Sequence, residues 1–395
     1  MKTIEINKKI YDISSPTTEE FKKLYIKSLE SNSSNTIPYF QLNSTNIDGF
    51  RIDLRCPDDK VYRAEIYDDN GKLTYSANLQ NGWFCKLNKK YYVKWKTKLF
   101  DGDELVYEED FSLKGKRVFI VIDSSSLGDS LAWIPYCEIF AKKHECNVIV
   151  STFRNELYEK QYPDLEFVNP GSTVHNIHAL YKIGWFYNQD MEPEYPSTIP
   201  LQKTATNILG LDFKEVRPKL NFFAGPRPYS GKYVTIGTTA TSGCKMWTQE
   251  NWQKLIDKLN GLGYKVAVIQ KEPIDGLKYV MDWTGDVSLH KRMNQLYYSE
   301  FFIGLGSGLS WLAWAMNKHV VMISNFSEDG HEFTENTTRI KNTSVCHGCW
   351  NNPMFKFDKG DWNWCPEHKG TERQFECHKS ITSEMVLEQI EHLLT

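Results

Sequence analysis

One carboxylate, Asp129, lies between two apolar stretches, in the sequence SSSLGDSLAWIPYCEIF that runs from Ser124 to Phe140. In the loop after a buried strand, a carboxylate can act as a general base if it reaches the proton that it removes. Asp is also a favoured helix N-cap residue, and Gly128 before it would ease the turn. Residue types and spacing leave both roles open.

A second loop, GLGSGLSW from Gly304 to Trp311, contains three glycines and two serines between an apolar strand and an apolar helix. Such a loop leaves backbone N–H groups open at a helix N-terminus, where an anion binds favourably. It is not a Walker A sequence, because no lysine follows the glycines, and a simple tight turn is the alternative. The candidate ligand-binding residues of this loop are Ser307, Gly308, Leu309 and Ser310.

Two charged residues, Lys245 and Glu272, follow other apolar segments that are expected to be strands, in the same C-terminal part of the chain as the glycine-rich loop. Lys245, in SGCKMWTQENW after YVTIGTT, is placed to neutralise a phosphate. Glu272, after KVAVIQ, is placed to accept hydrogen bonds from ribose hydroxyls. The alternative for each is an ordinary exposed loop residue.

Four of the nine cysteines cluster near the C-terminus. They are Cys346, Cys349, Cys365 and Cys377. The first two form a C-x2-C pair, fifteen residues separate this pair from the third cysteine, and eleven residues separate the third from the fourth. Four thiolates at such spacing suit zinc or iron, and a closed four-ligand site is structural. The candidates to replace one thiolate are His347, His368 and His378. The other five cysteines, Cys56, Cys85, Cys137, Cys146 and Cys244, are expected to be ordinary buried or solitary thiols.

Strand-helix-strand patterns position these residues. KRVFIVIDSSSLGDSLAWIPYCEIFAKKHECNVIVSTF is typical of a βαβ unit, and the pattern recurs from KYVTIGTT to VIQKE and in EFFIGLGSGLSWLAWAMNKHVVMISN. In the second unit an apolar helical face is followed by Gly261 or Gly263 as the helix end. Ligands of such folds bind at the carboxyl ends of the strands, so the candidate loops should face one crevice.

The sequence predicts an α/β protein with two Rossmann-like halves joined by a Pro-rich interval. Alternating segments with Asp-Asn-Gly and Asp-Gly turns predict an antiparallel β region before them. The predicted domains are an N-terminal β domain at 1–115, Rossmann-like domains at 116–225 and 226–340, a four-cysteine metal finger at 341–380 and a C-terminal helix at 381–395.

Composition excludes several function classes. The formal net charge of −3, without a basic block, argues against a nucleic-acid partner. The N-terminus lacks the apolar core of a signal peptide, and the longest apolar run, from Phe301 to Met316, is too short and glycine-rich for a span of roughly 20 residues. We therefore expect a cytoplasmic protein without a membrane span.

These motifs together resemble the bacterial autotransporter heptosyltransferase family, a group of protein O-heptosyltransferases related to the lipopolysaccharide heptosyltransferases. The segments that carry the resemblance are NGWFCKLNKKYYVKWK, SLGDSLAWIPYCEIF, FFIGLGSGLSWLAWAM and CHGCWNNPMFKFDKGDWNWCPEHKGTERQFEC. The last two are highly specific, and together the four segments span most of the chain.

The resemblance implies a GT-B glycosyltransferase that uses ADP-heptose to modify serine hydroxyls of autotransporter adhesins in the cytoplasm. It also implies a four-cysteine iron finger, with one structural iron per subunit, and ring-shaped dodecamers. Asp129 matches the family's catalytic aspartate on the acceptor side, and Lys245, with Trp247 in a K-x-W motif, matches the lysine that faces the sugar nucleotide.

One loop departs from the lipopolysaccharide enzymes, which carry Asp-Thr-Gly-Leu-Ser-His there. Here it reads Gly306, Ser307, Gly308, Leu309, Ser310, Trp311, so the Asp and His are absent. This favours the protein-modifying branch over a lipid acceptor.

The expected reaction is inverting: Asp129 takes the serine proton as its oxygen attacks the anomeric carbon, and ADP leaves from the opposite face. Lys245 and the amides around Ser307 to Ser310 would stabilise the departing diphosphate without requiring a catalytic magnesium ion. The alternatives are a lipopolysaccharide-type heptosyltransferase, a protein glycosyltransferase with another donor such as a UDP-hexose, and a non-enzymatic oligomeric binding module.

Overall fold

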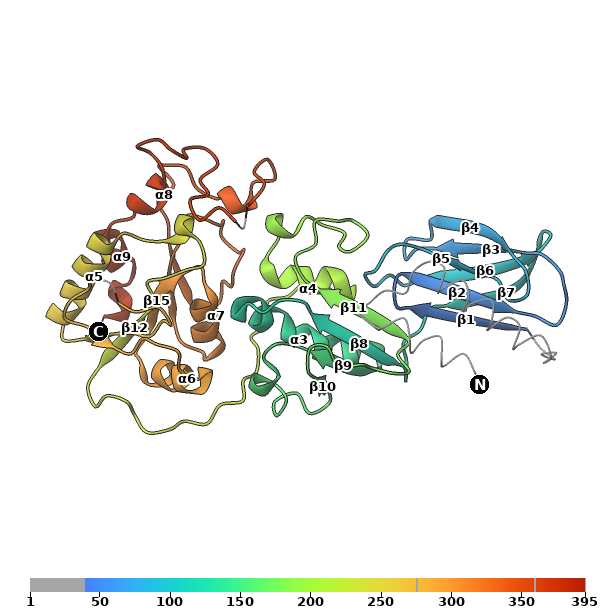
Figure 1. The fold of residues 1–395 in the computed structure, drawn as a ribbon, viewed down its shortest axis with the longest axis horizontal. Coiled ribbons are helices and arrows are strands. Elements are labelled where there is room, and N and C mark those ends of the chain that lie inside the picture. Colours follow the sequence, from blue (N-terminus) through green and yellow to red (C-terminus); the bar gives the residue numbers. More distant parts are fainter. Residues whose placement is uncertain (1–39, 275, 359, 395) are drawn as a thin grey trace.

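The structure is a computed structural model that describes residues 40–274, 276–358 and 360–394. Two α/β halves lie side by side, and a small antiparallel sheet flanks the first half (Figure 1). Residues 1–39 of the predicted N-terminal β domain lie outside the described part.

The first half is built on a seven-stranded mixed sheet in the order β10-β9-β8-β11-β1-β2-β5. Its strands are β1 Gln41–Asn46, β2 Phe50–Arg55, β5 Phe84–Lys86, β8 Arg117–Ile122, β9 Asn147–Ser151, β10 Glu166–Val168 and β11 Ala179–Ile183. The helix α3, Leu127–His144, connects β8 to β9, which confirms the first predicted βαβ unit. A second helix, α4, spans Leu201–Leu209, and short 3₁₀ turns are η1 Asn155–Leu157 and η2 Pro196–Thr198.

The predicted antiparallel β region is present, but its strands divide between two sheets. β3 Tyr62–Tyr67, β4 Leu73–Leu79, β6 Lys96–Asp101 and β7 Glu104–Asp110 form a sheet of their own. The strands β1, β2 and β5 instead extend the first α/β sheet, because β1 pairs in parallel with β11 through Asn46 and Ala179. The two sheets share a core in which the Phe50 ring lies 5.6 Å from that of Trp95 and 5.2 Å from that of Phe111.

The second half has a six-stranded parallel sheet in the order β14-β13-β12-β15-β16-β17. Its strands are β12 Tyr233–Ile236, β13 Lys265–Val268, β14 Met281–Asp282, β15 Phe302–Leu305, β16 Val320–Ile323 and β17 Thr337–Ile340. Its helices are α5 Gln249–Gly261, α6 Leu289–Tyr298, α7 Gly308–Ala315, α8 Glu376–Lys379 and α9 Ser383–Gln389. The remaining 3₁₀ turns are η3 Gly243–Lys245, η4 Cys349–Asn351 and η5 Glu391–Leu393.

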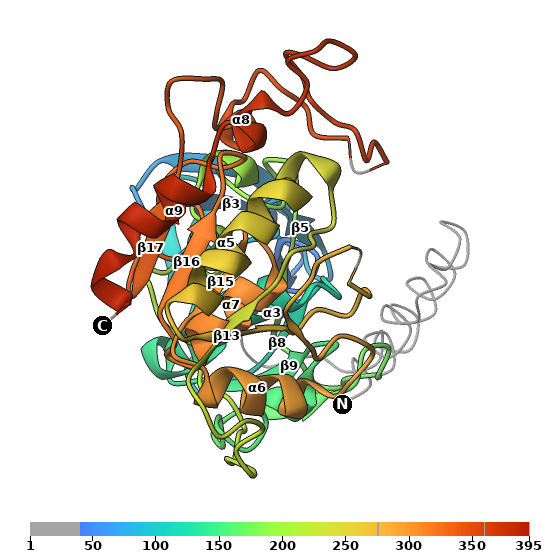
Figure 2. The same ribbon diagram turned by 90° about the vertical axis from the view of Figure 1, so that its left-hand side faces the viewer.

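Local chemistry explains the helices of this half. Thr248 caps α5 by accepting the Asn251 N–H, and the predicted apolar face of Trp252, Leu255, Ile256 and Leu259 is buried. α5 and α9 share a core with one face of the sheet, whereas α7 packs against the same sheet in a second cluster that continues into the first half, where α7 contacts α3. Figure 2 shows α8 and the loops around it above this sheet. In the described part of the chain, no helix is both long and apolar enough to cross a membrane.

Candidate functional site

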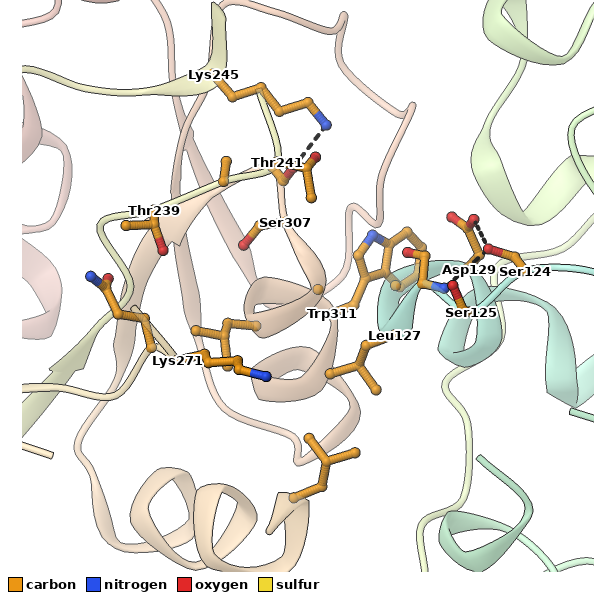
Figure 3. A pocket seen from close by; sticks show the side chains of 18 of the residues that line it. Ser124, Ser125, Leu127, Asp129, Thr239, Thr241, Lys245, Lys271, Ser307 and Trp311 are labelled. Carbon is orange, nitrogen blue, oxygen red and sulfur yellow. Dashed lines mark hydrogen bonds between the residues drawn. The ribbon is translucent and has the colours of Figure 1, made fainter. Parts of the chain in front are cut away.

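A cleft of about 1420 Å³ lies between the two halves, lined by loops that follow β8, β12, β13 and β15. These are the carboxyl ends of parallel strands, where ligands of open α/β sheets bind. The loop of Asp129 lies on one side, and those of Lys245 and Ser307 on the other (Figure 3). Six predicted site residues line the cleft: Asp129, Lys245, Glu272, Ser307, Gly308 and Leu309.

Asp129 is the third residue of α3, and Ser126 occupies the N-cap position in its place. The carboxylate therefore lies in the first helical turn, where the helix dipole favours a negative charge. Its Oδ2 accepts hydrogen bonds from Ser124 Oγ at 2.7 Å and from Trp185 Nε1 at 2.9 Å. Only 8% of the residue is exposed, so these donors hold the carboxylate in one orientation at the cleft wall.

The N-termini of α3 and α7 meet at this cleft, and glycines permit the close contact. A Cβ on Gly128 would lie 3.0 Å from Trp311 Cδ1, and one on Gly308 would lie 3.2 Å from Leu127 Cβ. The first N–H groups of a helix have no partner within the helix and carry partial positive charge. The arrangement thus favours an anion between the two halves.

Lys245 brings a full positive charge to the same place. Its Nζ donates to the carbonyl oxygen of Gly306 at 3.3 Å and lies 4.8 Å from the ring centroid of Phe326. The ammonium group therefore lies beside the glycine loop that begins α7.

Glu272 lines the cleft after β13, where its Oε2 accepts a hydrogen bond from Thr239 Oγ1 at 2.9 Å. Both are oxygen-bearing side chains of the second half that line the cleft. Because the Thr239 hydroxyl donates to Glu272, the two side chains offer hydrogen-bond acceptors to a polar ligand such as a ribose.

Two predicted donor-binding residues face away from the cleft. Trp247 is buried in the core of the second half, where Nε1 donates to Ile381 O at 2.8 Å and the ring lies 4.8 Å from Trp252. Ser310 is fully buried, and its Oγ donates to Leu305 O at 2.5 Å. These residues fix the loops that carry Lys245 and Gly308.

A buried carboxylate that the sequence analysis missed supports the glycine loop from behind. Glu332 pairs with Arg339 at 2.6 Å and accepts from Ser327 Oγ at 2.9 Å. Burial alone would raise the pKa of Glu332, but the neighbouring positive charges, first among them the Arg339 guanidinium, together outweigh burial and lower the pKa to about 2. A Cβ on Gly306 would lie 2.9 Å from Glu332 Oε1, so this loop requires glycine there. Glu332 and Arg339 lie seven residues apart in a loop and a strand, and no spacing rule links them.

The cysteine segment, residues 341–380, contributes to the cleft wall. Trp350, Phe357, Gly360, Asp361 and Trp362 line the cleft, and Trp362 O accepts from Gly243 N at 3.0 Å. The segment therefore adjoins the loop of Lys245, which the spacing of its cysteines did not predict.

The predicted metal ligands lie near one another, although their arrangement differs from a tetrathiolate. Burial, then repulsion from neighbouring thiolates and carboxylates, raises the pKa of Cys349 to about 12. In the described part of the chain, the group whose potential ligand atoms all lie within 4.8 Å of one another, and which could therefore hold a metal ion, is Cys346, Glu367 and His368. His378 Nδ1 lies 3.2 Å from Cys377 Sγ. The soft thiols of this segment suit zinc or iron, and the four-cysteine site stays a prediction. The other five cysteines are buried, as expected.

Comparison with known proteins places these features in a family context. The family model of Glycosyltransferase family 9 (heptosyltransferase) matches residues 197–362. Autotransporter heptosyltransferase Aah of Escherichia coli is 36% identical, with 81% of this chain and 85% of that protein aligned. The inactive autotransporter heptosyltransferase BimC of Burkholderia thailandensis is 29% identical over 86% of this chain and 82% of that protein.

A solved structure extends the likeness to most of the chain. The crystal structure of TibC, a bacterial iron-containing dodecameric glycosyltransferase from enterotoxigenic E. coli H10407, has a TM-score of 0.81 and 32% identity. It covers 91% of this chain and 97% of the TibC chain. A second structure of dodecameric iron-containing TibC, in complex with ADP-D-beta-D-heptose, gives a TM-score of 0.80 at 32% identity, over 90% of this chain and 96% of that one.

Proposed function

Because the chain belongs to the autotransporter heptosyltransferase family, we propose that it transfers heptose from ADP-heptose to serine hydroxyls of an autotransporter adhesin. The observation that carries this proposal is the cleft itself. It has an oriented carboxylate on one wall, and a lysine and a helix N-terminus on the other.

On the acceptor side, Asp129 acts as general base. It removes the proton of the serine hydroxyl as that oxygen attacks the anomeric carbon, and the sugar inverts as ADP leaves from the opposite face. The hydrogen bonds from Ser124 and Trp185 support this role, because they orient the carboxylate before the substrate arrives.

On the donor side, Lys245 and the N-terminal amides of α7 bind the diphosphate and stabilise the charge that develops on it. Ser307, Gly308 and Leu309 supply the start of this helix, and Glu272 accepts from the ribose hydroxyls. The loops that carry Lys245, Glu272 and Ser307 all belong to the second half. In this proposal the second half acts as the nucleotide-sugar domain of a GT-B enzyme.

The metal in this proposal is iron, held by Cys346, Cys349, Cys365 and Cys377, with zinc as the alternative. Bound metal would fasten the turns of the cysteine segment, which has little regular structure of its own. The likeness of the chain to iron-containing, dodecameric TibC supports iron as the metal and a homo-oligomer as the assembly, and a dodecamer is the expected state. The proposed site of action is the cytoplasm.

A reconstituted transfer assay tests the proposal, and it is needed because BimC, at 29% identity, is an inactive member. The purified protein is incubated with ADP-heptose and an unmodified autotransporter passenger, and the passenger mass is measured. We expect increments of one heptose, at serines, and none with a UDP-hexose or with lipid A core as acceptor. Transfer to the lipid, transfer from the UDP-hexose, or no transfer to any acceptor would each overturn it.

A further inference from the structure

An aromatic cluster, formed by the cysteine segment and the loop after β16, lies between the two proposed functional groups of the cleft. Phe326, Trp350 and Trp364 are its buried aromatic residues, and the partly buried Phe357 packs against them. Trp185, from the first half, packs against it, and its ring centroid lies 5.3 Å from that of Trp350 in an edge-to-face contact. Such contacts are directional and worth more than their buried area alone.

Both functional groups touch this cluster. Trp185 donates its Nε1 to Asp129 Oδ2 at 2.9 Å. On the other side of the cleft, Lys245 Nζ lies over the ring of Phe326, which stacks on Trp350 at 5.5 Å. Trp350 therefore contacts Asp129 through one intervening residue, Trp185, and Lys245 through another, Phe326.

Trp350 is itself held firmly. Its Nε1 donates to His331 Nε2 at 2.8 Å, and its backbone N donates to Phe326 O at 3.0 Å. His331 is buried, and its Nδ1 donates in turn to Ile199 O at 2.9 Å. Trp350 directly follows Cys349, so the cysteine segment fixes where this ring lies.

We propose that Trp350 and Trp185 are positioning residues that transmit the placement of the cysteine segment to the carboxylate of Asp129. The proposal rests on the proposed function, in which Asp129 is the base. Trp350 holds the Trp185 ring across the cleft, and the Trp185 N–H in turn aims Oδ2. On this account the cysteine segment contributes to the chemical step through two indole rings, in addition to stabilising its own turns.

The test compares single variants of the full-length protein. Trp185→Phe keeps a ring against Trp350 but removes the N–H donor. Loss of a hydrogen bond to a charged group corresponds to a fall in kcat of roughly ten- to a hundredfold. Trp350→Leu removes the edge-to-face contact and should cause a similar fall, whereas Trp350→Phe, which retains a ring, should restore much of the rate.

The matched control is Trp364→Phe. Trp364 belongs to the same cluster, but it packs on Phe326 and Phe357 and donates its Nε1 to Lys356 O. We expect kcat within about twofold of the wild type for this variant. For every variant the metal content, particle size and KM for ADP-heptose are measured beside kcat, because a purely structural defect would change them together.

The proposal is supported if kcat falls in Trp185→Phe while donor KM, metal content and assembly stay at wild-type values. It is overturned if kcat is unchanged, or if it falls only in step with loss of metal or donor affinity. Asp129→Asn distinguishes failure of the proposed base from failure of the proposed positioning role. If this variant transfers heptose normally, the proposed base is wrong, whereas an inactive Asp129→Asn beside a normal Trp185→Phe refutes only the positioning role.

Discussion

Replacing Lys245 with methionine should weaken the binding of ADP, because the lysine lies where the diphosphate is proposed to bind. Its Nζ is 3.3 Å from Gly306 O, in the loop that begins α7. Two unit charges about 4 Å apart attract by about 4 kcal/mol at an effective dielectric constant near 20. Desolvation of both groups offsets part of this, which leaves about 2–3 kcal/mol, or a roughly 30- to 150-fold rise in Kd.

Isothermal titration calorimetry with ADP at low salt measures this change directly. Lys254→Met is the matched control, because Lys254 is an exposed helix lysine that pairs with Glu250 at 2.7 Å on α5. The difference in ADP affinity between wild type and Lys245→Met should narrow as salt is added, since screening weakens the charge interaction that the wild type makes and the variant lacks. An ADP affinity within twofold of the wild type at low salt would refute the placement of the diphosphate beside Lys245.

Three further predictions follow from burial, packing and metal binding. Burial raises the pKa of Glu192 to about 8 from an ordinary 4.5, so its contribution to stability is present below about pH 4.5 and is lost as the pH rises through 8. Glu192→Gln should therefore raise the free energy of unfolding at pH 9 by about 5 kcal/mol and change it little at pH 4, as measured by urea denaturation. A free energy of unfolding that Glu192→Gln does not raise at pH 9 would contradict this. Gly128→Val should push Trp311 away and lower both donor affinity and kcat by roughly tenfold, whereas Gly261→Ala, whose added Cβ meets open space, should leave both unchanged. Cys377→Ser should lose metal and disassemble the particle, as seen by elemental analysis and size-exclusion chromatography; a metal-free variant that stays assembled and active would show that the site is dispensable.

The α/β architecture was predictable because its signals are local. Buried parallel strands such as β12 and β15 read as continuous apolar runs, and the face of α5 repeats with helical periodicity. The crevice followed from topology, since loops after parallel strands end on one edge of a sheet. Lys245 and Gly308 could thus be placed at one edge of the second sheet, and Asp129 at the corresponding edge of the first, without knowledge of any contact.

What the sequence left open depends on contacts between distant segments. The pairing of Asn46 with Ala179 joins β1 to the α/β sheet, yet the alternating pattern of β1 is the same as that of a separate β domain. Trp185 meets Asp129 only because the first sheet brings residues 56 positions apart together. Trp247, in contrast, lies close to Lys245 in the chain but points into the core.

The measurement that tests the central claim most directly is the intact mass of an autotransporter passenger produced together with this protein in cells that make ADP-heptose. With the wild-type chain the account predicts mass increments of one heptose, located at serines by fragmentation. With Asp129→Asn it predicts an unmodified passenger, although the variant folds and still binds ADP with wild-type affinity. A passenger that carries the same increments with Asp129→Asn, or none with the wild-type chain, would contradict the account.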